Sequence, residues 1–192
     1  MTDMTMASAS STPGPQDLLR RKIGWLCHAI RIIAVLWICW LLFRVIRVWS
    51  EATELLNNYA RYLQADLSGL SNVQYDASFA VALCVCAFAV AVSYFIWRLF
   101  GTYLQGRIFT IDAAVWMRRL GVAGIVAVMA DVVARPLIAF ILTTHLPAGS
   151  HDYGVAVVPG DLLHLLFSVF VLALAHIFKT AAEIADDHSR IV

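Results

Sequence analysis

The chain has 192 residues, of which 61% are hydrophobic and only 14% are Asp, Glu, Lys or Arg. A soluble domain carries roughly 25% charged residues, and one of this length could not bury so much apolar surface away from water. The formal net charge of +1 carries no signal of direct nucleic-acid binding. These numbers exclude an ordinary soluble domain and favour a protein of the lipid bilayer.

Four segments are apolar for long enough to cross a hydrocarbon core about 30 Å thick, which takes roughly 20 helical residues. We predict membrane-spanning helices at about 23–43, 78–100, 120–143 and 161–182. The small, polar and proline-containing residues 1–19 predict a disordered N-terminal tail, before one membrane domain at 20–192. The expected fold class is therefore all-α, an integral membrane four-helix bundle.

The basic residues are distributed unequally between the two sides of this expected bundle. Nine lie at 20–22, in the connection between the second and third spans with its edges, and in the C-terminal flank at Lys179 and Arg190, against three between the first and second spans. Because loops on the cytoplasmic side of a membrane carry the excess of Lys and Arg, this distribution predicts both termini in the cytoplasm.

Both connections with recognisable patterns are predicted to contain helix. In the outer connection at 50–77, apolar residues recur at helical spacing against charged ones, which predicts an amphipathic helix that either packs as a connector or captures a partner. In the inner connection, Gly106 is placed to end one helix and Thr110 to cap a short helix starting near Ile111. This helix carries Trp116 and Arg118-Arg119 to headgroup level before it runs into the third span.

The inner connection also carries a resemblance. The stretch from Tyr103 to Asp112 resembles the Y-x-x-G-x-I-F-T-x-(D/E) signature of the bacterial membrane protein family catalogued as domain of unknown function 2975. The matching residues are Tyr103, Gly106, Ile108, Phe109, Thr110 and Asp112. The acidic ending at 183–192 is similar to the family's ending, although it closes on S-R-I-V where many members have D-L-T-I.

The resemblance implies a four-span protein of the bacterial cytoplasmic (inner) membrane, with the signature between the second and third spans. It implies no established activity. Members of the family often resemble partners of small helix-turn-helix regulators encoded nearby, which implies a regulatory role and a cytoplasmic regulatory protein as partner.

Polar residues inside the spans need a separate explanation. Asp131 and Arg135 lie one turn apart on the third span, and because each charge at the bilayer centre costs about 2.5–3.5 kcal/mol, we expect them to pair. Arg31 on the first span and His164 on the fourth complete a predicted buried network of Arg31, Asp131, Arg135 and His164. The network is either a clamp that fixes helix register or a proton or ligand site. Its surplus arginine would suit an anionic ligand or lipid headgroup.

We expect no cofactor, no metal and no enzymatic activity. His28 and His176 lie at similar depth and could ligate a haem, but no second pair or glycine and aromatic pattern supports a macrocycle. His145 and His151-Asp152 offer too few ligands for a metal site, and the chain has no catalytic sequence motif.

Two hypotheses for function follow. The first is a non-enzymatic membrane protein that acts by protein contact in a regulatory role. The alternative is a small transporter or channel that uses the Asp131–Arg135 pair, and because four spans without an internal repeat make a poor transporter alone, it would require a homo-oligomer.

Overall fold

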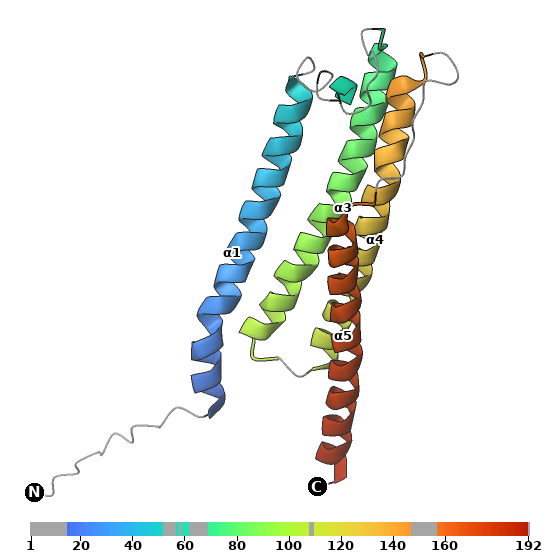
Figure 1. Cartoon of the computed structure of the whole chain (residues 1–192). Helices are drawn as coiled ribbons and strands as arrows, with labels where there is room; N and C mark the ends of the chain where they lie inside the picture. The colour runs from blue at the N-terminus through green and yellow to red at the C-terminus, as the bar shows by residue number, and fades with distance from the viewer. Residues whose placement is uncertain are drawn as a thin grey trace, which may run out of the picture.

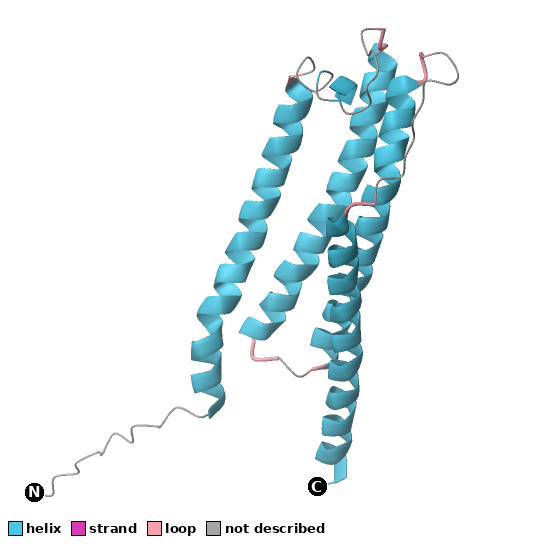
Figure 2. Ribbon diagram, in the orientation of Figure 1, coloured by secondary structure: helices cyan, strands magenta, loops and turns pink. Residues whose placement is uncertain are grey.

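The computed structural model describes residues 15–51, 57, 59–61, 69–107, 110–146 and 157–191 of the chain. Within these ranges there is no strand, and the long helices are α1 (Pro15–Ser50), α3 (Asn72–Leu104), α4 (Ile111–Thr143) and α5 (Pro159–Ile191) (Figures 1 and 2). All 4 helices contain a segment long and apolar enough to cross a membrane. The all-α, four-span prediction is therefore confirmed, and the chain is a multi-pass membrane protein.

Helix α1 is longer than its predicted span at both ends. It begins at Pro15, a residue type favoured in the first turn of helices, and so includes residues 15–19, which the composition had placed in the tail. The tail residues 1–14 lie outside the described residues. At its other end α1 continues to Ser50, where Arg47 pairs with Glu51 at 3.6 Å, one turn further along the chain.

The helices pack in chain order: α1 on α3, α3 on α4, and α4 on α5. Figure 1 shows the first residue of α1 and the last of α5 at the same end of the molecule, as an even number of spans requires. We name this the inner end, because the distribution of basic residues predicts that it faces the cytoplasm. The opposite end is the outer end.

Two clusters of buried apolar side chains form the core. Near the inner end, Leu99 of α3, Met117 of α4 and Ala175 of α5 meet. Near the outer end, Ile138 and Leu142 of α4 are packed against half-buried residues that include Tyr59. The outer helix predicted within 50–77 lies mostly outside the described residues, but Asn57 and residues 59–61 are helical.

Helix α5 is displaced along the bundle axis toward the inner end. It begins beside the outer half of α4 and runs past the inner ends of α3 and α4 (Figure 1). Two glycines of α4 allow the backbones of α4 and α5 to approach closely. A Cβ added at Gly124 would lie 2.4 Å from Ser168 Oγ, and one at Gly121 would lie 2.7 Å from Leu172 Cγ and 3.1 Å from its backbone nitrogen.

Candidate functional site

Two carboxylates, one on α4 and one on α5, gather around Arg135. Its guanidinium forms an ion pair with Asp131 one turn earlier on α4, as the spacing predicted. It also donates two parallel hydrogen bonds to Asp161 of α5, from Nη1 to Oδ2 at 2.7 Å and from Nη2 to Oδ1 at 2.7 Å. Such bidentate pairs are the most directional of charged hydrogen bonds, so the site fixes α5 against α4. We call these three residues the ion-pair cluster.

The start of α5 positions Asp161 for this contact. Pro159 opens the helix, where its missing N–H is no loss. The backbone N–H of Val158 donates to Asp161 Oδ2 at 2.9 Å, and the N–H of Asp161 donates to the carbonyl oxygen of Val158 at 2.8 Å. A carboxylate in the first turn also stabilises the positive end of the helix dipole. One side chain therefore caps α5 and ties it to α4.

The cluster carries an excess of negative charge. Two carboxylates face one guanidinium, which gives a formal charge of −1 rather than the surplus of positive charge that the sequence led us to expect. The exposure is uneven: the side chain of Asp161 is 11% exposed, that of Arg135 34% and that of Asp131 46%. Asp131 is therefore the most exposed member of the cluster.

Sequence reasoning missed Asp161 as a member of the cluster. It was read only as the first residue of the fourth span, and no pattern in one sequence gives the register between two helices. A signal was present, because a Pro-Gly-Asp sequence before an apolar run is typical of a helix start, where an acidic side chain is favoured.

Arg31 does not join the cluster, contrary to our prediction. It lies on α1, which packs on α3, and its guanidinium carbon is 4.0 Å from the ring centroid of Trp97. Among the described residues its buried Nε has no hydrogen-bond partner. The aromatic face supplies the electrostatic attraction that a carboxylate was expected to supply.

His164 lies closer to the cluster. It follows Asp161 by one helical turn and is near enough to interact electrostatically with that carboxylate. Its side chain is exposed, and its backbone carbonyl accepts a hydrogen bond from Ser168 Oγ at 2.8 Å. The role of the four predicted residues as a functional site stays a prediction.

The first half of the signature stretch ends α3. Gly106 has a φ of +78°, a conformation that glycine adopts without strain. The N–H of Gly106 donates to Tyr103 O at 3.0 Å, and the N–H of Arg107 donates to Thr102 O at 3.2 Å. This pair of bonds is a Schellman motif, which satisfies the last carbonyls of a helix. The ring of Tyr103 packs against the inner core cluster.

The second half of the stretch starts α4. Thr110 Oγ1 accepts a hydrogen bond from the N–H of Ala113 at 3.3 Å, as predicted for a helix cap. Asp112 stands in the first turn and pairs with Arg107 at 3.4 Å across the connection. The short helix predicted near Ile111 is the beginning of α4. Ile108 and Phe109 lie outside the described residues, and the described signature residues all have a role in the turn.

The histidines considered for haem lie on different parts of the molecule. His28 on α1 and His176 on α5 are both exposed, and α1 packs on α3 while α5 packs on α4. In the ranges that the structure covers, no three His, Cys, Asp or Glu side chains gather as metal ligands would. His151 and Asp152 lie outside those ranges.

Comparison with known proteins gives one match. The model of a family described as "Protein of unknown function (DUF2975)" matches residues 48–192. The match includes α3, α4, α5, the ion-pair cluster and the turn at Gly106, and leaves out almost all of α1. No curated protein and no solved structure matches the chain. Since the match covers most of its length and includes the signature stretch, the chain belongs to the DUF2975 family.

Proposed function

We propose that this protein is a non-enzymatic regulator in the cytoplasmic membrane of a bacterium, and that it acts by binding a cytoplasmic protein. The observation that carries the proposal is the length and register of α5. This helix is continuous from Pro159 to Ile191, and its inner end lies beyond the ends of α3 and α4 (Figure 1). A helix that leaves its bundle offers a surface to another molecule.

The register gives the length of the projecting part. Gly121 of α4 faces Leu172 of α5, and the two helices run in opposite directions. Residues near Ala182, which is buried, are therefore level with the start of α4 at Ile111. The residues from Glu183 to Ile191 continue for about 13 Å at 1.5 Å per residue.

The charge of this projecting segment favours a protein over a lipid surface. Its sequence, E-I-A-D-D-H-S-R-I, contains three acidic residues and one arginine. Because the cytoplasmic leaflet is itself anionic, an acidic segment is repelled from the lipid headgroups. A basic protein surface is the complementary partner.

In this proposal the ion-pair cluster has a supporting role: it fixes the position of α5 along α4. Arg135 holds the start of α5 at one height along α4, and this contact sets how far the other end projects. The cluster then has a structural role, and binding occurs at the inner end.

The test is recovery of a partner from detergent-solubilised membranes. We expect the intact chain to retain the same cytoplasmic protein in replicate purifications analysed by mass spectrometry. The triple variant E183K/D186K/D187K should lose that protein, because the charge of the projecting segment is reversed. A control variant, Glu51→Lys at the outer end, should retain it. Recovery of no reproducible partner, or equal recovery by the triple variant, would contradict the proposal.

A second function, a small oligomeric transporter or channel, is favoured by the charge of the cluster. The excess negative charge and the 46% exposure of the Asp131 side chain suit a site that a proton or cation occupies. In Asp131→Asn the bidentate bond between Arg135 and Asp161 remains, so the variant should still fold. Cation flux in liposomes that the intact chain catalyses and D131N does not would support transport. Absence of flux with the intact chain would exclude it.

A further inference from the structure

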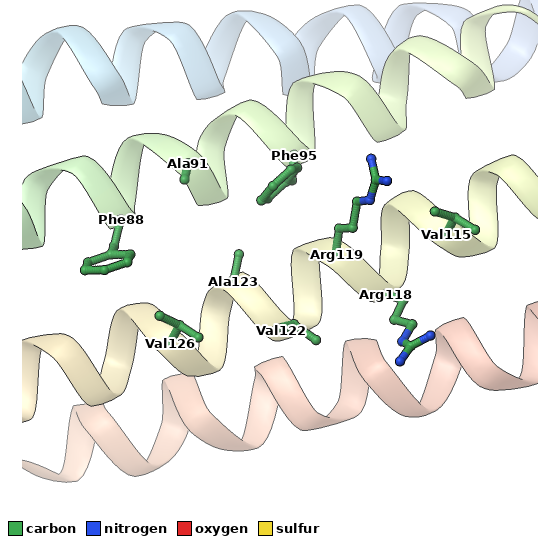
Figure 3. A pocket seen from close by; sticks show the side chains of 9 residues that line it. All are labelled: Phe88, Ala91, Phe95, Val115, Arg118, Arg119, Val122, Ala123 and Val126. Carbon is green, nitrogen blue, oxygen red and sulfur yellow. The ribbon is translucent and has the colours of Figure 1, made fainter.

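A groove runs between α3 and α4 on the surface of the molecule. It encloses about 580 Å³, a volume in the range of small-molecule sites. Figure 3 shows Ala91 of α3 and Ala123 of α4 opposite each other, with the rings of Phe88 and Phe95 on either side of Ala91. The two small side chains leave the space that the larger neighbours border.

The α4 wall of this groove is one stripe of a helix. Val115, Val122 and Val126 recur at helical spacing and are all exposed, so the groove opens on the surface that faces lipid. From Val115 to Val126 the groove extends for about 16 Å along α4. That length is close to half of a hydrocarbon core about 30 Å thick, which is the depth of one leaflet.

Two arginines line the inner part of the groove. Arg118 and Arg119 both line it, one turn from its innermost α4 residue, Val115, and both are exposed. Figure 3 shows their guanidinium groups directed to different sides of α4. Arg119 lies over the ring of Trp116 at 4.7 Å, with Arg98 of α3 at 4.8 Å from the same ring. Within the described part of the chain, neither Arg118 nor Arg119 forms an ion pair.

From Arg118 to Val126 the apolar wall continues for about 12 Å toward the middle of the membrane. This wall, beside guanidinium groups that form no ion pair with any described residue, is complementary to one kind of molecule. We infer that the groove binds an anionic phospholipid of the inner leaflet. One acyl chain lies between Phe88 and Phe95 against Ala91 and Ala123, and the phosphate lies at the level of Arg118 and Arg119 along α4. Basic sites between membrane helices on the cytoplasmic side recognise acidic headgroups in this way.

The neighbouring groove shows why the arginines decide the occupant. It lies between the same two helices nearer the outer end, encloses about 500 Å³, and is lined by apolar residues that include Val85, Ala130 and Val133. A site of that composition would accept any acyl chain. The basic end distinguishes an anionic lipid from a zwitterionic one only in the inner groove.

The experiment is native mass spectrometry of the full chain in detergent, with phosphatidylglycerol or phosphatidylcholine of identical acyl chains added. We expect retention of phosphatidylglycerol at concentrations where phosphatidylcholine is not retained. The variant R118Q/R119Q should bind phosphatidylglycerol at least about tenfold more weakly, since each basic residue near the surface contributes about a factor of five. The control R44Q/R47Q, which removes the same charge at the outer end, should bind normally.

A second pair of variants tests the apolar half of the site. Ala123→Leu and Ala91→Leu each fill the space between Ala91 and Ala123, which we call the notch, and should weaken lipid retention. Ala130→Leu in the neighbouring groove should not. Circular dichroism of each variant confirms that it remains helical, and the two notch variants are made separately so that one misfolded protein leaves the other.

Three results would overturn the inference. The first is equal retention of both lipids by the intact chain. The second is unchanged retention of phosphatidylglycerol by R118Q/R119Q or by both notch variants. The third is a complex whose mass corresponds to a second copy of the chain in place of a lipid.

Discussion

The α4–α5 and α1–α3 interfaces join pairs of long helices by different means. Between α4 and α5, glycines at two positions allow the backbones to approach, and a bidentate ion pair ties Arg135 to Asp161. Between α1 and α3, aromatic rings meet: Trp49 packs against Tyr75 and Phe79, each with a ring-centroid distance of 5.2 Å. Among the described residues, no ion pair crosses this second interface.

The two interfaces differ in how strictly each fixes the distance between its helices and their relative position along the bundle axis. A glycine contact is lost if the helices separate by the size of one methyl group, and a bidentate pair is lost if they slide. Ring pairs are favourable over centroid distances of about 4.5–7 Å, and a cation is attracted within about 6 Å of a ring centroid, so these contacts tolerate small shifts. The matched family model includes α4 and α5 but only the last residues of α1, so the strict interface lies within the unit that the family shares.

The largest effect is expected from removing the charge at the centre of the cluster. Arg135→Gln leaves the carboxylates of Asp131 and Asp161 without a counter-charge inside the membrane domain, and should lower the free energy of unfolding by about 2–3 kcal/mol. Arg47→Gln removes an exposed pair with Glu51 and should change it by less than about 0.5 kcal/mol. Unfolding in mixed micelles, followed by circular dichroism, measures both.

The two carboxylates should not be equal. Asp161→Asn removes a bidentate partner that also caps α5, whereas Asp131→Asn removes a side chain that is 46% exposed. We expect the first variant to be the less stable of the two in the same assay. Equal losses would mean that the ion pair within α4, rather than the tie to α5, gives the cluster its stability.

The next effect is expected at the glycines of α4. Gly121→Ala and Gly124→Ala should each destabilise by about 1–3 kcal/mol, because the added methyl group meets Leu172 or Ser168. For Gly121 the obstacle includes backbone atoms at 3.1 Å, which no change of rotamer relieves. A result near zero would mean that the α4–α5 interface is as adaptable as the aromatic one.

Gly24 of α1 is the matched control for these variants. A Cβ at this position would meet no atom within 4 Å. Gly24→Ala should therefore raise the free energy of unfolding by about 0.5–1 kcal/mol, the usual gain from removing glycine inside a helix. The opposite signs of the α1 and α4 variants would separate a packing effect from a helix-propensity effect.

What the sequence could predict follows from how local each feature is. The spans, the cap at Thr110 and the stop at Gly106 depend on neighbouring residues. Each predicted span lies within one helix of the structure, and the cap and the stop are at the predicted residues. The pairing of Asp131 with Arg135 depends on one helical turn and was also predicted. Each of these is set within a few residues of chain.

Contacts that depend on the relative position of two helices were not predicted correctly. The height of α5 along α4 decides that Asp161 completes the cluster, and hydrophobicity alone gives no such height. Arg31 was assigned to the cluster for the same reason, since its depth on α1 said nothing of which helix it faced. The excess negative charge of the cluster, which bears on any transport function, follows from this one register.

The smallest effect is expected at the α1–α3 interface. The hydroxyl of Tyr75 donates to the carbonyl oxygen of Trp49, which lies in the last turn of α1 and has no donor within the helix. Tyr75→Phe keeps the ring contact with Trp49 and should cost about 0.5–1.5 kcal/mol, the net value of one hydrogen bond. Tyr94→Phe, at a residue that is 48% exposed, should cost nothing measurable. A loss for Tyr75→Phe as large as that for Arg135→Gln would mean that α1 is held as strictly as α5, and that the contrast between the two interfaces is wrong.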